Sequence, residues 1–489
     1  MSEFSEECSK IFKQNGITIY QFADKIGVDR TTLQRMNSGR KLPSRQFVKK
    51  VLDHLPISVN EREHLEHLFY IEKVGKQVYR RRQAVKELIE NFYEVSKSMT
   101  EANYHRKLNF SIEQFSDEKS VNSISMEVDI IDALRYIVID AFKRSKEVHI
   151  YMNNFKNAYY IMQQMIQESN ESSKKATCHQ LVNLQRNIQL NLGDSGIGNV
   201  EILKDALPFL VSFKGEYDLR YSYGAVDENY LGTALWPNYV ISEYQVLLLS
   251  VDGKTGILIE NEDIAKNYLE EVKKIQQKYQ PLISFVGKDE AALNFLTEEI
   301  SHKLFKYEYS TSINIAEFIY KTISDEDFIN VEIGRQYVSS YKNTQPIAQY
   351  KNFKKIGGMS WMKEFMENGI LPEIYRNYIK PYSKERRVEM IKEYAKHLEV
   401  SQNEYLLKNT VNDQKASFGF NLVDSNGIYI CISKNNQYYA SIYIEEIGIY
   451  DTFADYIEGL IEEEKVYSAK ESGKKFLEQC MKYLEEADG

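Results

Sequence analysis

Residues 21–44 read QFADKIGVDRTTLQRMNSGRKLPS, and this stretch decides the fold of the N-terminal part of the chain. Thr18 and Asp29 are typical helix caps, so they predict two short helices that begin directly after them. Gln21, three residues after Thr18, would complete a capping box. Gly27 lies between the two helices and permits a turn with positive φ. The stretch therefore predicts two helices joined by a tight turn.

The surrounding residues predict a small helical domain around this pair. We expect helices over residues 6–14, 19–26 and 30–37, and a fourth after the cap Ser44. The small side chain of Ala23 allows two helices to cross closely. Apolar side chains would anchor the third helix on the core, namely those of Val28, Leu33 and Met36.

This pattern resembles the Xre family, the Cro and phage-repressor type of helix-turn-helix, over roughly residues 6–58. The resemblance implies that the third helix lies in the major groove of a double-stranded DNA operator. The implied base-reading residues are Arg30, Thr31, Thr32, Gln34 and Arg35, and the implied phosphate contacts are Thr18, Arg40, Lys41 and Arg45. Many members of the family carry Gln where this chain has Ile19, which leaves backbone amides to contact phosphate there. The alternative is a fold of this type that mediates only protein contacts.

The charge of the chain is unevenly distributed. The 489 residues carry a net charge of -9, but residues 1–98 hold 18 basic and 13 acidic residues, a balance of +5. The remainder holds 44 basic and 58 acidic residues, a balance of -14. A basic module on an acidic body is typical of a protein that meets a polyanion at one end only.

Cysteine usage and hydropathy indicate a cytoplasmic protein. The four cysteines form no CxxC pair, which argues against a disulfide framework or a cysteine-rich zinc site. No apolar run approaches the roughly 20 residues that a membrane-spanning helix needs, so we expect no membrane association. We also expect no cofactor and no bound metal.

A longer helix is predicted over residues 77–97, and its apolar residues follow a heptad-like spacing. This spacing favours a dimerisation helix, with the candidate contacts Val78, Val85, Leu88, Phe92 and Val95. A dimer would read two half-sites of an operator. The alternative is a connector that packs on its own chain.

The rest of the sequence predicts a large mixed α/β body, so the fold class is multidomain α+β. Strands are expected over residues 147–152, 207–213, 218–223 and 239–250, and a meander of three antiparallel strands is expected within residues 418–444. Residues 290–410 are expected to be mainly helical. The predicted ranges are a helix-turn-helix domain (1–72), a connector (73–100), a mixed α/β sensor domain (101–287) and a C-terminal region (288–489) that joins helices to the meander.

No arrangement of residues predicts an enzyme. Gly253-Lys254-Thr255 resembles the end of a phosphate-binding loop, but the required earlier glycine is Leu248, and the segment is expected to be a hairpin turn. His64 and His67 lie three residues apart on a helix without a third ligand nearby, and His149 is expected to be structural.

The sequence therefore favours a DNA-binding transcription regulator, such as a repressor, that acts as a homodimer. Its body would sense a small-molecule, peptide or protein effector. The alternative is an antitoxin- or phage-defence-type interaction protein that regulates its own operon through the helix-turn-helix.

Overall fold

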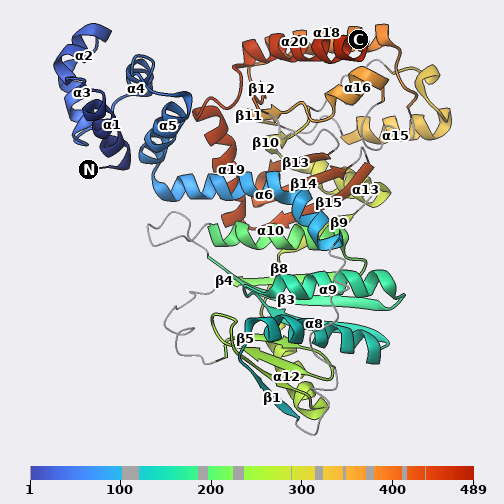
Figure 1. Ribbon diagram of the computed structural model, residues 1–489. Coiled ribbons are helices and arrows are strands. Elements are labelled where there is room, and N and C mark those ends of the chain that lie inside the picture. The colour runs from blue at the N-terminus through green and yellow to red at the C-terminus, as the bar shows by residue number, and fades with distance from the viewer. Residues whose placement is uncertain are drawn as a thin grey trace. The chain divides into compact units, whose positions relative to one another are not determined.

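The computed structural model describes residues 2–101, 120–185, 197–223, 236–287, 289–313, 323–344, 349–370, 379–409, 416–434 and 437–488. The chain forms two compact units, Met1–Gln83 and Ala84–Gly489. The boundary between them falls within one helix, α6 (Lys76–Glu101). The predicted fold class is confirmed, because an all-helical N-terminal region precedes a body of helices and mixed sheets (Figure 1).

The N-terminal unit consists of helices packed around one small core. Before α6 its helices are α1 (Glu3–Gln14), α2 (Ile19–Ile26), α3 (Arg30–Asn37), α4 (Arg45–Leu52) and α5 (Val59–Val74). Every one of these helices contributes buried apolar side chains to the core, among them Phe12, Phe22, Leu33, Val48 and Phe69. The four predicted short helices are thus confirmed, with α1 starting three residues earlier because Ser2 caps it.

The first half of the body forms an eight-stranded sheet in the order β1-β7-β6-β5-β2-β3-β4-β8. Its elements are β1 (Val121–Ile124), α8 (Glu127–Arg144), β2 (Glu147–Asn153), α9 (Ala158–Glu171), β3 (Lys175–Leu184), α10 (Ile197–Ser212), β4 (Glu216–Tyr223), β5 (Asn238–Ile241), β6 (Val246–Leu249), β7 (Gly256–Ile259), α12 (Glu262–Gln276) and β8 (Gln280–Pro281). Strands β2, β3 and β4 run parallel, and the other pairings are antiparallel. Each parallel step needs a crossover, and α9 lies in the connection from β2 to β3.

Helices cover both faces of this sheet. Ile150 and Cys178 point to the side of α8 and α9, where they join a large apolar cluster. Tyr151 and Leu181 point to the opposite side and pack with apolar residues of α12. This alternation along each strand follows from the two-residue period of a pleated strand. The same alternation determines which polar side chains of β2, β3 and β4 lie on the face of the sheet that α12 covers.

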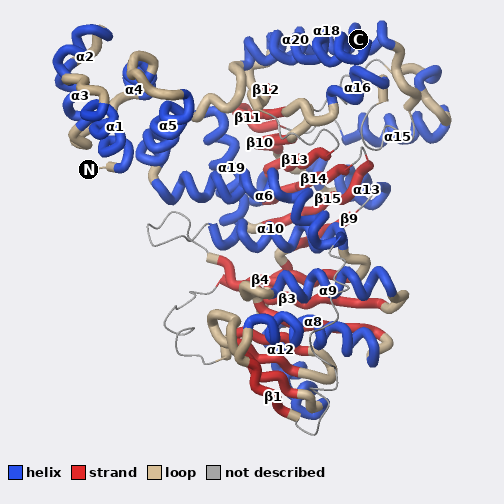
Figure 2. The backbone as a smooth tube through the Cα atoms, in the orientation of Figure 1, coloured by secondary structure: helices blue, strands red, loops and turns tan. Residues whose placement is uncertain are grey.

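The second half of the body forms a seven-stranded sheet in the order β12-β11-β10-β13-β14-β15-β9. Its strands are β9 (Ile283–Gly287), β10 (Phe305–Ser310), β11 (Gln349–Gly357), β12 (Glu404–Leu406), β13 (Ala416–Val423), β14 (Gly427–Lys434) and β15 (Gln437–Glu445). Its helices are α13 (Asp289–Glu298), α15 (Val331–Thr344), α16 (Met362–Asn368), α18 (Lys384–Val400), α19 (Ile447–Glu462) and α20 (Ala469–Asp488), with short 3-10 turns η1 (Ile300–His302), η2 (Asp325–Asp327) and η3 (Asp424–Asn426). Figure 2 shows its strands in red, with helices packed around them.

Apolar residues from both halves of the body meet in its largest cluster. The cluster joins α10 and β4 of the first half to β13, β14, β15 and α19 of the second half. Phe418, Ile430 and Phe453 are fully buried in it. The same cluster takes up residues of α6 from Ala84 onward, so this part of α6 is an element of the body core.

Some predictions about the body are confirmed and others are wrong. Strands β13, β14 and β15 form the predicted meander, and residues 250–255 form the predicted hairpin turn, with Gly253 at a φ of 67°. The strands expected over residues 147–152 and 218–223 are β2 and β4, whereas the strand expected over 239–250 is divided into β5 and β6 by a turn. Residues 207–213, predicted as a strand, belong mostly to α10, because a short fully buried apolar run has no period that separates strand from helix. The described part of residues 290–410 contains more helix than strand, as predicted, but it also contains β10, β11 and β12.

Candidate nucleic-acid interface

The turn between α2 and α3 has the backbone geometry that the sequence predicts. Gly27 ends α2 in the left-handed conformation, with φ 61° and ψ 51°, which a residue with a Cβ rarely adopts. The Lys50 Nζ atom, from α4, donates to the Gly27 carbonyl at 3.0 Å. A cation at the C-terminal end of a helix is favourable because the carbonyl groups there carry partial negative charge. Sequence reasoning did not single out Lys50, whose partner lies 23 residues away.

The caps of both helices form, although one differs from the prediction. The Thr18 side chain accepts from the Gln21 backbone N–H at 3.4 Å, but the Gln21 side chain accepts from the Thr18 hydroxyl and not from the Thr18 backbone. The predicted capping box is therefore only half formed. At α3, the Asp29 Oδ2 atom accepts from the Thr32 backbone N–H at 2.6 Å. Hydrogen bonds from Thr32 hold the pKa of Asp29 below its usual value, so this cap stays charged at neutral pH.

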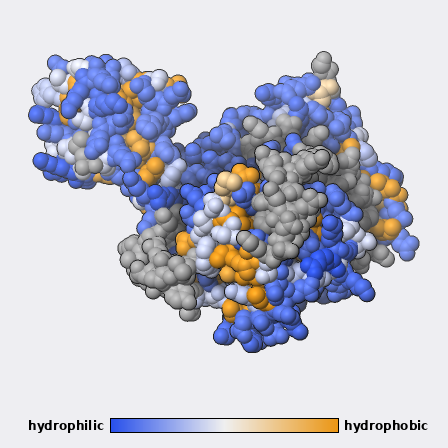
Figure 3. All heavy atoms as spheres, turned by 60° about the horizontal axis from the view of Figure 1, so that its bottom comes forward, coloured by the Kyte–Doolittle hydropathy of each residue, from blue (hydrophilic) through white to orange (hydrophobic). Residues whose placement is uncertain are grey.

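Helix α3 buries one side and exposes the other. Leu33 and Met36 are buried in the core and Val28 packs against it, which confirms the predicted anchors. The implied contact residues Thr18, Arg30, Thr31, Gln34, Arg35, Arg40 and Lys41 are exposed, whereas Thr32 and Arg45 are half-buried. The face of the N-terminal unit that Figure 3 shows is mostly hydrophilic, with scattered apolar positions.

The exposed residues lie in a strongly basic stretch of chain. From Arg30 to Leu52 the sequence contains seven basic residues and no acidic one. The stretch runs from the first residue of α3 to the last residue of α4. A helix that presents Arg, Thr and Gln beside further cations has donors for base edges and charges for phosphates. This surface can bind a polyanion that has hydrogen-bond acceptors along its length.

The predicted dimer contacts on α6 are placed mainly inside the body. Val85, Leu88 and Phe92 are at most 2% exposed and belong to the largest cluster of the body. Val95 is half-buried against the neighbouring cluster, and Val78 is half-buried in the N-terminal unit. The hydroxyl of Tyr93, next to Phe92, donates toward the Ser417 and Ser433 carbonyls, at 2.5 and 2.8 Å. The chain's own body thus buries Val85, Leu88 and Phe92, as the alternative of a connector packed on its own chain predicts.

The body contains a chain of polar side chains that sequence reasoning missed. The neighbouring strands β2, β3 and β4 place His149, His179 and Asp218 side by side on the α12 side of the first sheet. His149 Nδ1 lies 3.3 Å from His179 Nε2, and His179 Nδ1 lies 3.0 Å from Asp218 Oδ2. Arg220 Nε donates to Asp218 Oδ1 at 2.8 Å. No local pattern could reveal this cluster, because it depends on the register of parallel strands.

The charges in this cluster are set by its contacts. Burial alone would raise the pKa of Asp218, but hydrogen bonds from His179 and Arg220 outweigh it and hold that pKa below its usual value. Burial, together with the neighbouring His179, lowers the pKa of His149. A neutral His149 can donate from Nδ1 to His179, which then donates from its own Nδ1 to Asp218. The prediction that His149 is structural is compatible with this chain of hydrogen bonds.

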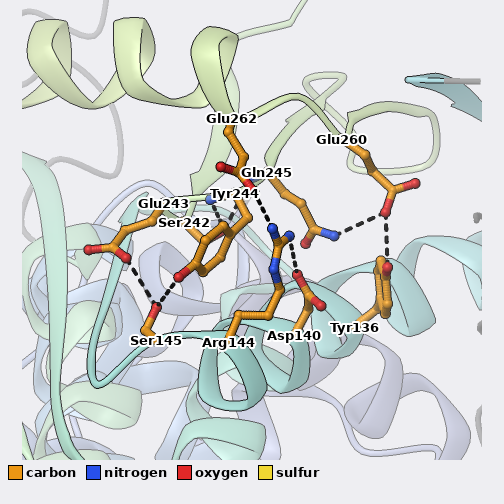
Figure 4. Close-up of polar contacts among 10 residues, drawn as sticks. All are labelled: Tyr136, Asp140, Arg144, Ser145, Ser242, Glu243, Tyr244, Gln245, Glu260 and Glu262. Atoms are coloured by element: carbon orange, nitrogen blue, oxygen red, sulfur yellow. Dashed lines mark hydrogen bonds and ion pairs between the residues drawn. The ribbon is translucent and has the colours of Figure 1, made fainter.

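A second polar cluster closes one end of the first sheet (Figure 4). Tyr136 donates to Glu260 Oε1 at 2.9 Å, and Gln245 donates to the same oxygen at 3.1 Å. Nearby, the Arg144 guanidinium lies 3.8 Å from the centre of the Tyr244 ring and pairs with Asp140 and Glu262. The groups come from α8, from the turn between β5 and β6, from Glu260 directly after β7, and from Glu262 at the start of α12. Their mutual pairing ties α8 to the sheet, which is a structural role.

Within the described part of the chain, no group of three or more His, Cys, Asp or Glu side chains is arranged to hold a metal ion. None of the described helices is long and apolar enough to cross a membrane.

Comparisons with known proteins bear on the N-terminal unit. Residues 9–62 match the family model described as helix-turn-helix, which confirms the resemblance to Xre-type domains. A comparison with curated proteins gives no match. Among solved structures, TrmBL2, an archaeal chromatin protein, matches with 14% identity over 46% of this chain and 72% of its own, with a TM-score of 0.20. Polyphosphate kinase from Porphyromonas gingivalis matches with 10% identity over 70% of this chain and 47% of its own, also with a TM-score of 0.20. At such scores neither likeness carries an argument about this chain.

Proposed function

We propose that the chain is a DNA-binding transcription regulator whose helix α3 reads an operator in the major groove. The exposed face of α3 carries the proposal, since Arg30, Gln34 and Arg35 point away from a core that holds Leu33 and Met36. The family match and the basic stretch from Arg30 to Leu52 support it. Arg suits the paired acceptors of guanine, and Gln suits the edge of adenine.

The proposal includes a dimer and a sensory role for the body. One small domain contacts a short stretch of DNA, and two copies would read two half-sites. The body, Ala84–Gly489, takes no part in the implied contacts to DNA, and we assign it the binding of an effector rather than catalysis. Sedimentation velocity on the full chain at micromolar concentration tests the dimer, and a single monomer boundary contradicts it.

The binding test begins with genomic fragments that the full chain selects. Arg30→Ala and Arg35→Ala should each weaken binding to the selected fragment by about 1–3 kcal/mol, because each removes one base contact. Binding should also fall steeply with salt, because Lys and Arg displace counterions from the phosphates. The matched control is Lys10→Ala, which removes one positive charge that is already paired with Glu7 at 3.1 Å.

The decisive variant in this test lacks both arginines of α3. An Arg30→Ala/Arg35→Ala double variant that binds the fragment as tightly as Lys10→Ala refutes the assignment of α3. Both arginines are exposed, so circular dichroism of the variants should match that of the unaltered chain. The genes next to the selected fragments would show which operons the protein regulates.

A further inference from the structure

Tyr20 is a large aromatic residue that the core of the N-terminal unit does not use. It lies in the first turn of α2, and 64% of its surface is exposed. The buried side of the same helix is formed by Phe22, Ala23 and Ile26. Packing of the domain therefore gives no reason for an aromatic ring at this position.

The ring instead faces a cation from the next helix. The Arg30 Cζ atom lies over the Tyr20 ring, 4.9 Å from its centre. Arg30 is the first residue of α3, directly after the charged cap Asp29, and no acidic residue follows it in the first turn of the helix. The negative face of an aromatic ring attracts a guanidinium at this distance. The contact thus gives the Arg30 guanidinium a partner on the face of the Tyr20 ring.

We propose that Tyr20 is a positioning residue that holds Arg30 ready for the O6 and N7 acceptors of a guanine in the major groove. The inference rests on the proposed function and deepens it by naming the base. An aromatic ring offers no conventional hydrogen-bond acceptor, so a guanidinium over the ring keeps N–H donors for other acceptors. Those donors form the fork that matches the two guanine acceptors.

Such positioning affects specific binding more than general attraction to DNA. A free arginine side chain has many rotamers, and fixing one of them in advance lowers the entropy lost on binding. A base edge accepts hydrogen bonds in one geometry, whereas contacts to the phosphate backbone carry no sequence information. Loss of the ring should therefore weaken the preference for the operator and leave non-specific binding unchanged.

A double-mutant cycle on the full chain tests the proposal, with the fragment that the unaltered chain selects and with unrelated DNA of equal length. Tyr20→Ala should weaken operator binding about 2- to 5-fold, in line with an exposed cation–π contact. Tyr20→Phe keeps the ring and should bind like the unaltered chain. In an Arg30→Ala background, Tyr20→Ala should cause no further loss. The preference for a G·C pair at one operator position should fall both in Tyr20→Ala and in Arg30→Ala.

The control and the contrary outcomes separate the two proposals. Val59→Ala removes another exposed apolar side chain of the same unit, 70% exposed, and should change neither affinity. Equal losses from Tyr20→Ala in both backgrounds, equal losses on operator and unrelated DNA, or failure of Tyr20→Phe to restore binding would each refute the role of Tyr20 alone. An unaltered chain that prefers no DNA fragment over another refutes the proposed function, and with it this role.

Discussion

Replacing Phe92 by Ala should destabilise the body. Phe92 is 2% exposed, and its ring lies edge-on to those of Tyr93 and Phe418, at centroid distances of 5.1 and 5.6 Å. Truncation of a buried Phe costs about 3–5 kcal/mol, and edge-on ring pairs add to the value of burial alone. We therefore expect a loss of about 4–5 kcal/mol in the free energy of unfolding of the body, a large share of ordinary protein stability.

Native-state hydrogen exchange on the full chain measures this loss where it occurs. Amides of β13 that exchange through unfolding of the body should exchange about 700- to 4,000-fold faster in Phe92→Ala, because each 1.4 kcal/mol is a factor of ten. The matched control is Asn91→Ala, the exposed neighbour on α6, which should change stability by no more than about 0.5 kcal/mol.

A different result is expected if α6 pairs with a second copy of the chain through Phe92. In that case Phe92→Ala would change the sedimentation of the chain with protein concentration, and β13 would exchange as it does in Asn91→Ala. This outcome would refute the packing of α6 on the body and support the predicted dimerisation helix.

Three further predictions concern the two units separately. Gly27→Ala should lower the free energy of unfolding of the N-terminal unit by about 1–2 kcal/mol because φ is 61°. Gly27→Asn should lower it less, because Asn tolerates this conformation better. Urea unfolding followed by circular dichroism compares the two variants, and equal losses would contradict the argument. Asp29→Ala should cost about 1 kcal/mol through the lost cap, and Asp29→Ser should restore most of it in the same assay. Because the pKa of His149 is lower in the folded chain, the unfolded chain binds its proton more readily; this contribution to stability is complete above about pH 6.5 and is lost on acidification below it. His149→Gln should flatten the fall in thermal stability of the body between about pH 6.5 and 5, and an unchanged slope would count against this assignment. The corresponding contribution of Asp218, whose pKa is also lowered, is lost only below about pH 4.

The N-terminal unit could be predicted from the sequence because its signals are local. Caps such as Asp29, the turn residue Gly27 and the spacing of Leu33 and Met36 all lie within 20 residues of one another. The meander of β13 to β15 was predictable for the same reason, since turn residues separate its strands. The exposed residues of α3 are mostly those that the family resemblance implied.

The body was harder to predict because its organisation depends on distant pairings. Strands β10 and β11 are parallel neighbours separated by α15, and nothing in either strand alone indicates the other. The run around Phe209 is buried as a helix that contains Pro208, although its composition also suits a strand. The contact between Tyr20 and Arg30 depends on how two helices cross, which residue spacing does not specify.

The position of β9 affects how the chain folds during synthesis. The first sheet ends at β8 (Gln280–Pro281), and β9 begins only two residues later but pairs with β15, where Gly287 lies opposite Ser441. A ribosome adding about 5–20 residues per second needs roughly 10–30 s to make the intervening chain. Throughout that interval β9 lacks its native partner, and an unpaired strand edge can pair with another nascent chain. Variants in β15 that weaken its pairing with β9 should therefore promote aggregation of nascent chains.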